Sequence, residues 1–400
     1  MSLRADDPLV EILVRNEKYW AGQKVLIVGE INSLQLLSQL VRTEQATILS
    51  DNFETAQGLS AMMGVTLERG AFARAQKKHV TVLFGNCHDP QVLAAIEPFD
   101  TLVLFLSKTK SLSQDLLWQL RDRLAPETKV LIIGSNAIGG KSADGLIRDA
   151  GEVYKVDSAR KSTVFLGYIT LQDELKTPKT LKSVVYGGQE CKQLHGLFSQ
   201  GELDGGTKML LQALHHDLST TYHAPEPADQ DYEHAVLKDL PLSLGDPILD
   251  LGCGSGIIGL TLAARGCTNI LSTDVSATAL YATQENAQAL GLTAAVTPFA
   301  CNMLPSSKEL QALSGDKANV FGSGKFKYIV TNPPFHQGIE RTTSPTLDMI
   351  AKAKDHLTAD GALYLVGNTS LHYEQALQEA FTTVTTLAAT TKFTVFKATL

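Results

Sequence analysis

Short apolar runs alternate with helix-like stretches along the whole chain, and this alternation is the strongest constraint on its fold. Each run is bounded by Gly, Pro or Asp, which is typical of strands buried on both faces. The pattern predicts an α/β fold with mostly parallel sheets flanked by helices. The predicted strands are Lys24–Val28, Ala46–Leu49, Val80–Phe84, Thr101–Leu106, Lys129–Ile133, Ile248–Leu251, Asn269–Ser272, Tyr328–Thr331 and Ala362–Val366, and the predicted helices include Gln114–Leu124, Ala277–Leu290 and Thr346–His356.

The two halves of the chain also repeat one another. A first strand ends at Gly29 and again at Gly252, and an acidic residue follows 22 positions later in both halves, at Asp51 and Asp274. Three further pairs occur in the same order: Phe99-Asp-Thr-Leu-Val and Phe326-Lys-Tyr-Ile-Val, Ile132-Ile-Gly134 and Leu365-Val-Gly367, Lys161-Ser-Thr-Val-Phe165 and Lys392-Phe-Thr-Val-Phe396. We expect a duplicated domain, with residues 1–175 and 176–400 as the two copies; two unrelated α/β domains are the alternative.

Length and composition limit the classes of protein to which this chain can belong. A chain of 400 residues exceeds the roughly 250–300 residues of one hydrophobic core. The net charge of −7 means that a nucleic acid would have to be bound by local basic patches. The five cysteines form no CxxC pair, so neither a disulfide framework nor a metal site is expected. There is no basic-then-apolar leader and no apolar run of about 20 residues, which predicts a cytoplasmic protein without a membrane span.

The most informative motif is Ile248-Leu-Asp-Leu-Gly-Cys-Gly-Ser-Gly-Ile-Ile-Gly259. A buried strand passes into a glycine loop and then a helix, and Gly252, Gly254 and Gly256 leave room for close approach of a ligand. Asp274, at the end of the next strand, can accept both hydroxyls of a ribose. A GxGxxG loop with such an acid also suits a nicotinamide dinucleotide.

Asp250 favours a different cofactor. A carboxylate two residues before the first glycine suits the ammonium group of a methionine better than a pyrophosphate. The segment Asp250-Leu-Gly-Cys-Gly-Ser-Gly256, which includes Cys253, resembles the first motif of the class I methyltransferases. The resemblance implies Rossmann-like domains and S-adenosylmethionine as the cofactor. Asn302, near the end of the third strand, is either an adenine contact or a turn residue.

The first half has lost this motif. Its loop is Val28-Gly-Glu-Ile-Asn-Ser33, in which bulky residues replace the later glycines. The first domain is therefore expected to bind no cofactor, and Asp51 to be a helix cap or turn residue.

A second motif, Asn332-Pro-Pro-Phe335, directly follows the strand Tyr328–Thr331. Consecutive prolines cannot extend a central strand, so the chain must leave the sheet beside the cofactor loop. The Asn332 side-chain oxygen and the Pro333 carbonyl can accept hydrogen bonds from one NH₂ group, Pro334 stiffens the turn, and Phe335 can stack on a planar ring. This arrangement favours methylation of a conjugated nitrogen, by positioning and in-line displacement. The equivalent stretch of the first half, Leu104-Phe-Leu-Ser107, lacks the Asn.

These motifs, together with Leu197-Phe-Ser-Gln-Gly-Glu-Leu-Asp-Gly-Gly-Thr207, Tyr154-Lys-Val-Asp-Ser-Ala-Arg160 and Lys392-Phe-Thr-Val-Phe-Lys397, resemble the ribosomal RNA guanine-N2 methyltransferases of the RsmC type. The resemblance implies an inactive N-terminal copy, S-adenosylmethionine at Asp250–Gly256 and Asp274, and a target amine at Asn332–Phe335. It also implies that Phe198–Thr207 folds over the cofactor or target. The expected substrate is a guanine of 16S rRNA in the small ribosomal subunit, unstacked to reach the site.

Other features remain open at this point. Candidate RNA contacts lie in three basic clusters, Lys155/Arg160/Lys161, Lys176/Lys179/Lys182 and Arg69/Arg74/Lys77/Lys78. His336 is either a general base or a pocket residue, and residues 223–234 and 306–325 are predicted to be surface loops. We expect a monomer, although the sequence does not determine the oligomeric state. The alternatives are methylation of adenine N6 or of a protein glutamine amide, a non-catalytic ribosome-assembly adaptor, and a nicotinamide oxidoreductase.

Overall fold

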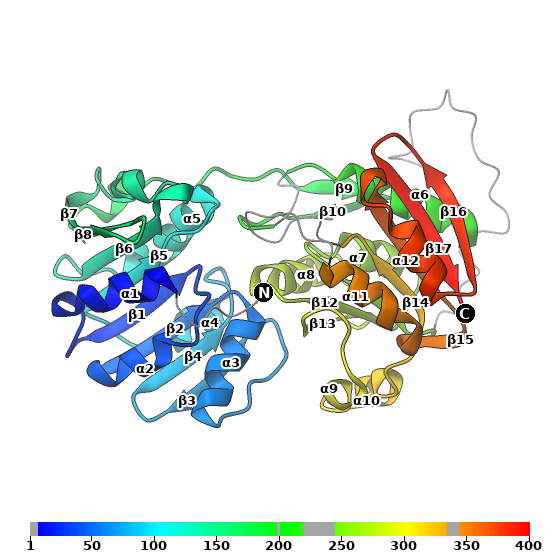
Figure 1. Cartoon of the computed structure of the whole chain (residues 1–400), viewed down its shortest axis with the longest axis horizontal. Coiled ribbons are helices and arrows are strands. Elements are labelled where there is room, and N and C mark those ends of the chain that lie inside the picture. Colours follow the sequence, from blue (N-terminus) through cyan, green and yellow to red (C-terminus); the bar gives the residue numbers. More distant parts are fainter. Residues whose placement is uncertain (1–6, 198–200, 219–244, 334–343) are drawn as a thin grey trace. The chain divides into compact units, whose positions relative to one another are not determined.

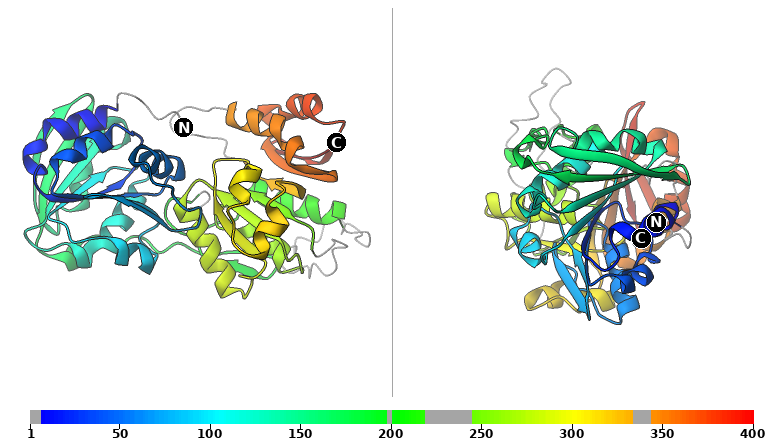
Figure 2. Two further views of the ribbon diagram at one scale, coloured as in Figure 1. Left: turned by 90° about the horizontal axis from the view of Figure 1, so that it is seen from below. Right: turned by 90° about the vertical axis from the view of Figure 1, so that its left-hand side faces the viewer.

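The computed structural model describes residues 7–197, 201–218, 245–333 and 344–400. The chain forms two compact units. Unit 1 comprises residues 1–180 with the short segment 276–281, and unit 2 comprises residues 181–275 and 282–400. In each unit helices cover both faces of a central sheet (Figure 1), and the further views in Figure 2 show the same layers.

Unit 1 is built on an eight-stranded sheet of order β3-β4-β2-β1-β5-β6-β8-β7. All neighbouring strands are parallel except the edge strand β3 on β4 and the strand β8, which runs antiparallel to β6 and β7. The elements are α1 (Pro8–Arg15), β1 (Lys24–Gly29), α2 (Leu36–Gln39), β2 (Gln45–Ser50), α3 (Phe53–Met63), β3 (Ala73–Lys77), β4 (Val80–Phe84), α4 (Pro90–Ala95), β5 (Thr101–Phe105), α5 (Lys110–Leu120), β6 (Lys129–Ser135), β7 (Gly151–Ala159) and β8 (Ser162–Ile169).

Unit 2 has a seven-stranded sheet of order β13-β12-β11-β14-β15-β17-β16 and a small hairpin, β9 (Val184–Tyr186) with β10 (Gln189–Cys191). The first five strands of the sheet are parallel, and β17 is antiparallel to both neighbours. The other elements are α6 (Gly205–Leu218), β11 (Ile248–Leu251), α7 (Ile257–Ala263), β12 (Ile270–Asp274), α8 (Ala277–Ala289), β13 (Val296–Ala300), α9 (Ser307–Leu310), α10 (Asp316–Phe321), β14 (Phe326–Thr331), α11 (Ser344–Ala353), β15 (Leu357–Asn368), α12 (Tyr373–Ala380), β16 (Thr383–Ala389) and β17 (Phe393–Thr399).

The two sheets share one strand order once the extra edge strand β3 is set aside, which confirms the predicted fold class of tandem Rossmann-like domains. The register between β6 and β8 in unit 1 also agrees with that between β15 and β17 in unit 2. Ile132 pairs with Phe165 and Gly134 with Thr163 in unit 1, while in unit 2 Leu365 pairs with Phe396 and Gly367 with Thr394. These are the residues that the sequence repeat places opposite one another, so the repeat reflects a duplicated structure.

The strand register corrects one equivalence between the halves. Ile27 pairs with Ile48, whereas Asp250 pairs with Ser272, so the counterpart of Asp274 is Ser50. Asp51 lies one position beyond that counterpart. Paired residues of the first two strands are one position closer along the chain in unit 1 than in unit 2. The equal spacing of 22 residues therefore hides this shift.

The segment 306–325 is also different from its prediction as a surface loop, since it contains α9 and α10. Ser306 and Glu309 form a reciprocal capping box at the start of α9. Leu310 and Phe321 are fully buried in the core, so these short helices are held by apolar packing.

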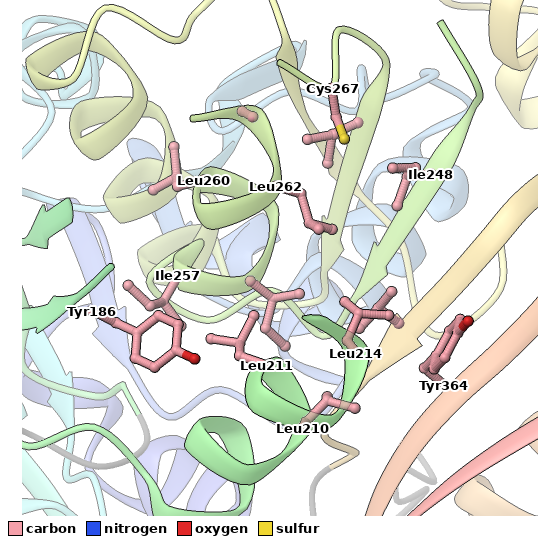
Figure 3. Packing of buried hydrophobic residues seen from close by; sticks show 14 of the residues in the cluster. Tyr186, Leu210, Leu211, Leu214, Ile248, Ile257, Leu260, Leu262, Cys267 and Tyr364 are labelled. Carbon is pink, nitrogen blue, oxygen red and sulfur yellow. The ribbon is translucent and has the colours of Figure 1, made fainter. Parts of the chain in front are cut away.

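Alternating side chains of the unit 2 strands enter two cores, one on each face of the sheet. Ile248 and Val330 pack with α6 and α7 on one face, while Leu249 and Ile329 pack with α11 and α12 on the other. Figure 3 shows the first core, where leucines of α6 point toward α7 and β11. Asp250 shares the face of Ile248, so its side chain points toward α7 rather than toward α11.

Candidate active site

The predicted site residues of unit 2 meet at the carboxyl edge of its sheet. Leu251 pairs with Thr331, so Gly252 and Asn332 leave neighbouring strands, β11 and β14, at the same level. Asp274 ends β12 and pairs with Ala300, the last residue of β13. The chain order reverses at β11, and ligands of open α/β sheets bind at this kind of switch point. The glycine loop, Asp274 and Asn332 therefore share one edge of the sheet.

The glycine loop is open where a ligand would have to approach. Gly252, Gly254 and Gly256 have φ of +74°, +55° and +83°, a left-handed conformation that favours glycine. A methyl group added at Gly252 or Gly254 would meet no atom of the described residues within 4 Å, whereas one at Gly256 would lie 2.9 Å from the Thr283 side chain. The first two glycines thus form an open cradle, and the third allows α8 to pack closely.

Asp274 shapes the same loop through its carboxylate. Its Oδ2 accepts a hydrogen bond from the Gly254 N–H at 3.1 Å. The Cys301 N–H donates to the Asp274 carbonyl at 3.0 Å, which ties the end of β12 to the chain beyond β13. Asn302 is the next residue and is exposed, so its amide lies at the edge of the sheet, outside the core.

Asp250 is fully buried beneath the loop, with an exposed fraction of 0%. Its Oδ2 accepts from the Gly259 N–H of α7 at 3.0 Å and from the Ser272 hydroxyl at 3.4 Å. Its Oδ1 has no hydrogen-bond partner among the residues that the structure describes. Burial raises the pKa of the carboxyl to about 7, the Gly259 hydrogen bond opposes this, and the nearby Asp274 charge adds to it. One oxygen thus holds α7, and the other suits a cation such as an ammonium group.

The Cys253 side chain, in contrast, faces the interior. The thiol is 4% exposed, and the Thr283 hydroxyl donates to its Sγ at 3.4 Å. Burial raises the pKa of this thiol well above its ordinary value. Its N–H donates to the Thr273 carbonyl at 2.9 Å. Any contribution of Cys253 to cofactor binding must therefore come from the conformation of its backbone rather than from its sulfur.

Asn332 has the most informative geometry of the site. Its Nδ2 donates to Asp204 Oδ2 at 2.9 Å and to Thr207 Oγ1 at 2.8 Å. Its Oδ1 is buried and has no partner among the described residues. Asp204 and Thr207 belong to the start of α6, so a segment remote in sequence fixes this amide. This oxygen without a described partner is the atom that the sequence predicted to accept a hydrogen bond from the target.

Several predicted residues lie outside the described structure. Pro333 is described and buried. Pro334, Phe335 and His336 are not among the described residues, nor are residues 198–200 of the segment expected to fold over the site, nor the predicted loop 223–234. The stacking role of Phe335 and the role of His336 remain predictions.

Sequence reasoning missed the residues that position the two loops. Asp204 caps α6 by accepting the Thr207 N–H at 2.9 Å, and an Asp directly before a helix is a typical cap, although this helix was not predicted. Asn286 of α8 connects the hairpin segment to the glycine loop. It accepts from the Lys192 N–H at 2.8 Å and donates to the Ser255 carbonyl at 3.0 Å. No local pattern identifies Asn286, because its partners lie far away in the sequence.

The corresponding place in unit 1 is closed by its own backbone. The Glu30 N–H donates to the Phe105 carbonyl at 3.1 Å, and a methyl group at Gly29 would lie 2.0 Å from that carbonyl oxygen. Phe105 occupies the register position of Asn332, and Ile27 that of Asp250. Glu30 and Phe105, together with α1, line a hollow of about 10 Å³, room for about one water molecule.

Some of the predicted RNA contacts, one in each basic cluster, are paired with acidic side chains. Arg160 contacts Glu11 at 2.8 Å, Lys176 contacts Asp149 at 3.1 Å, and Arg74 contacts Glu97 at 3.2 Å. Such pairs lower the net positive charge that a phosphate backbone meets.

Among the described residues there is no helix of the length and apolar character required to cross a membrane, and no cluster of three potential metal-ligating side chains.

Comparisons with known proteins agree with this picture. Residues 10–183 match the family described as methyltransferase small domain N-terminal, and residues 233–397 match the methyltransferase small domain. Relatives named "Ribosomal RNA small subunit methyltransferase C" from Photobacterium profundum and Vibrio cholerae are 26% and 28% identical over 397 residues, with 97% of each chain covered. The resemblance noted in the sequence is thus confirmed over nearly the whole chain.

A solved structure has the same fold. The T. thermophilus 16S rRNA N2 methyltransferase (RsmC), determined in complex with AdoMet and guanosine, has a TM-score of 0.69 and 22% sequence identity, covering 99% of this chain and 92% of that chain. The two family matches, the duplicated sheets and the site at the second sheet's edge lead to one conclusion. The chain belongs to the methyltransferase small domain family, with the N-terminal and the methyltransferase domains of that family in tandem.

Proposed function

We propose that this protein transfers a methyl group from S-adenosylmethionine to the exocyclic N2 amine of a guanine in the 16S rRNA of the small ribosomal subunit. Residues 176–400 carry the catalytic domain. Unit 1 does not take the cofactor, since its loop is closed onto Phe105 and lacks an equivalent of Asn332. The relatives over 97% of the chain bear the name of a small-subunit rRNA methyltransferase, which supports the choice of substrate.

The arrangement of Asn332 is the single observation on which the proposal depends most. Its oxygen is buried, has no partner among the described residues, and lies one strand away from the glycine loop. Strands in a sheet are about 4.8 Å apart. An NH₂ group that donates to this oxygen is therefore held next to whatever the loop binds.

The residues of the glycine edge fit S-adenosylmethionine. The open cradle at Gly252 and Gly254 would take the body of the molecule, the second oxygen of Asp250 its ammonium group, and Asp274 its ribose hydroxyls. The exposed Asn302 amide at the end of β13 would meet the adenine. The loop at Cys253 contributes backbone only, as its thiol is buried.

The chemistry requires positioning rather than a covalent intermediate on the protein. When bound, S-adenosylmethionine supplies an electrophilic methyl carbon; the amine lone pair forms the N–C bond, the C–S bond breaks, and sulfur keeps that electron pair. Asn332 and the Pro333 carbonyl each accept one amine hydrogen, which directs the lone pair out of the ring plane and toward the methyl carbon. From the sequence, we propose that Pro334 stiffens the turn and that Phe335 stacks on the base. The extra proton of the methylated nitrogen leaves to water.

Transfer of labelled methyl from S-adenosylmethionine tests the proposal directly. Small subunits, large subunits, naked 16S rRNA and a nuclease-treated protein extract are compared side by side, with Asn332→Ala as the inactive control. Label confined to small-subunit or 16S RNA is expected. Label in protein or in large subunits would overturn the substrate assignment. Absence of label, in a preparation shown by calorimetry to bind the cofactor, would overturn the proposed activity.

A further inference from the structure

Resting on the proposed function, we infer that Asp204 and Thr207 are positioning residues that lock the Asn332 amide in one orientation and thereby make the target site accept only an NH₂ group. An asparagine side chain can present either its oxygen or its NH₂ group to a ligand, because the two ends have nearly the same shape. Only one of these orientations can hold an amine. The identity of the neighbours decides which one is populated.

Of the two neighbours of the Asn332 nitrogen, Asp204 decides the orientation, and Thr207 supplies a second acceptor. Asp204 Oδ2, 2.9 Å away, is a carboxylate oxygen, which accepts hydrogen bonds and donates none. Thr207 Oγ1 accepts from the same nitrogen at 2.8 Å. If the amide were flipped, its oxygen would face the carboxylate oxygen, and its NH₂ group would point toward the target. The observed orientation is the only one in which both neighbours are satisfied.

The same carboxylate oxygen also fixes the start of α6. Asp204 Oδ2 accepts the Thr207 N–H at 2.9 Å, so the cap of the helix and the lock on Asn332 share one atom. Gly206 makes this possible, because a methyl group at that position would lie 2.9 Å from Asp204 Oδ2. Thr207 is 7% exposed, so water competes little for these hydrogen bonds.

The rest of α6 anchors the lock to the core. Leu210, Leu211 and Leu214 are buried in the core that α6 shares with α7 and β11, and Leu211 points toward Ile257 of α7 (Figure 3). At the other end of the helix, Asp217 accepts from the Tyr364 hydroxyl at 2.7 Å and contacts Lys397 at 2.7 Å. A helix held at both ends gives Asp204 and Thr207 fixed positions. The Asn332 oxygen is therefore preorganised before any substrate arrives.

Two pairs of variants separate the lock from a general structural role. Thr207→Val removes the hydroxyl acceptor at nearly constant shape, and Thr207→Ser keeps it. Asp204→Ala removes the carboxylate, and Asp204→Asn keeps an oxygen that can accept from both donors. We expect Thr207→Val and Asp204→Ala to lower kcat roughly 10- to 100-fold. Losses of this size are typical when a residue that orients a functional side chain is replaced. Thr207→Ser and Asp204→Asn should stay within a few-fold of the wild type, and the Kd for S-adenosylmethionine should change little in all four.

The controls keep the inference distinct from the proposed function. Thr101→Val, a buried Thr to Val change in unit 1, should leave kcat unchanged and reports any general cost of the substitution.

A second experiment does not depend on methyl transfer: exchange of the Asn332 side-chain amide hydrogens is followed by NMR, with Asn332→Ala used to assign the signals. Slow exchange in the wild type that becomes fast in Thr207→Val supports the lock, even if the wild type methylates none of the substrates tested. Equal exchange in both proteins, or wild-type kcat in Thr207→Val and Asp204→Ala, would overturn it. Equal losses in Asp204→Asn and Asp204→Ala would also overturn it, because charge and not the acceptor would then matter.

Discussion

Replacing the Asp250 carboxyl by an amide, in Asp250→Asn, should make the protein more stable at alkaline pH and weaken its binding of the cofactor. The carboxyl group is fully buried, one of its oxygens has no partner among the described residues, and burial raises its pKa to about 7. An asparagine side chain has the same shape and keeps an oxygen for the Gly259 N–H. It removes the charge that the ammonium group of S-adenosylmethionine would need.

The magnitude follows from the pKa change. The pKa rises by about 3 units from its ordinary 3.8 to about 7. The folded state therefore binds the extra proton between these values, and stability is lost as the pH rises through this window. At about 1.36 kcal/mol per unit, the loss is on the order of 4 kcal/mol by pH 8. The introduced amide would leave one buried N–H group unpaired, which costs about 1–3 kcal/mol. At pH 4 only about 0.5 kcal/mol of this loss is present. Asp250→Asn should thus gain about 1–3 kcal/mol at pH 8 and lose about 0.5–2.5 kcal/mol at pH 4.

Urea unfolding of the apo protein at pH 4 and pH 8, with calorimetry of S-adenosylmethionine binding at pH 8, measures both effects. We expect the sign of the stability change to reverse between the two pH values. Affinity should fall by about 1.5–3 kcal/mol, the scale of a hydrogen bond to a charged group. Ser272→Ala, which removes only the long 3.4 Å hydrogen bond to Asp250, is the matched control. The reasoning fails if Asp250→Asn is less stable at both pH values and binds the cofactor as the wild type does.

Three further outcomes are expected. Asp274→Ala should weaken S-adenosylmethionine binding by about 1.5–3 kcal/mol, because both the ribose acceptor and the Gly254 N–H partner are lost; unchanged affinity in calorimetry would place the ribose elsewhere. Asn332→Ala should abolish methyl transfer while the cofactor Kd stays within a few-fold; a large loss of affinity would contradict its role at the target. Gly259→Ala should destabilise unit 2 by about 1–3 kcal/mol in urea unfolding, since its methyl group would lie 2.9 Å from Asp250 Oδ2 and from Ser272 Oγ. A Gly259→Ala variant as stable as the wild type would mean that this part of the core yields easily.

The fold could be predicted from the sequence because each buried strand is an apolar run between turn residues. The predicted strand Val80–Phe84 agrees with β4 at both ends, and Ile248–Leu251 agrees with β11. The duplication was visible for the same reason, since equivalent strands carry similar residues. The shift of Asp51 relative to Asp274 was hidden, because register is set by hydrogen bonding between strands and not by spacing along one of them.

The site was predictable only in part. Asn332, Asp274 and the three glycines stood out because they end or directly follow apolar strands at the spacing of a ligand-binding loop. The burial of the Cys253 thiol was not visible, as a cysteine between glycines can face either the core or a ligand. The contacts of Asp204 with Asn332, 128 residues apart, depend on the packing of α6 against the sheet, which no local pattern encodes.

The nucleoside composition of the methylated product tests the central claim most directly. Small subunits are labelled with the purified protein and S-adenosylmethionine, their RNA is digested to nucleosides, and the labelled nucleoside is identified by mass spectrometry against standards, with Asn332→Ala in parallel. The account predicts that the label is found in N2-methylguanosine alone and is absent with Asn332→Ala. Label in N6-methyladenosine, in a ring-nitrogen methylguanosine or in a ribose-methylated nucleoside would contradict it.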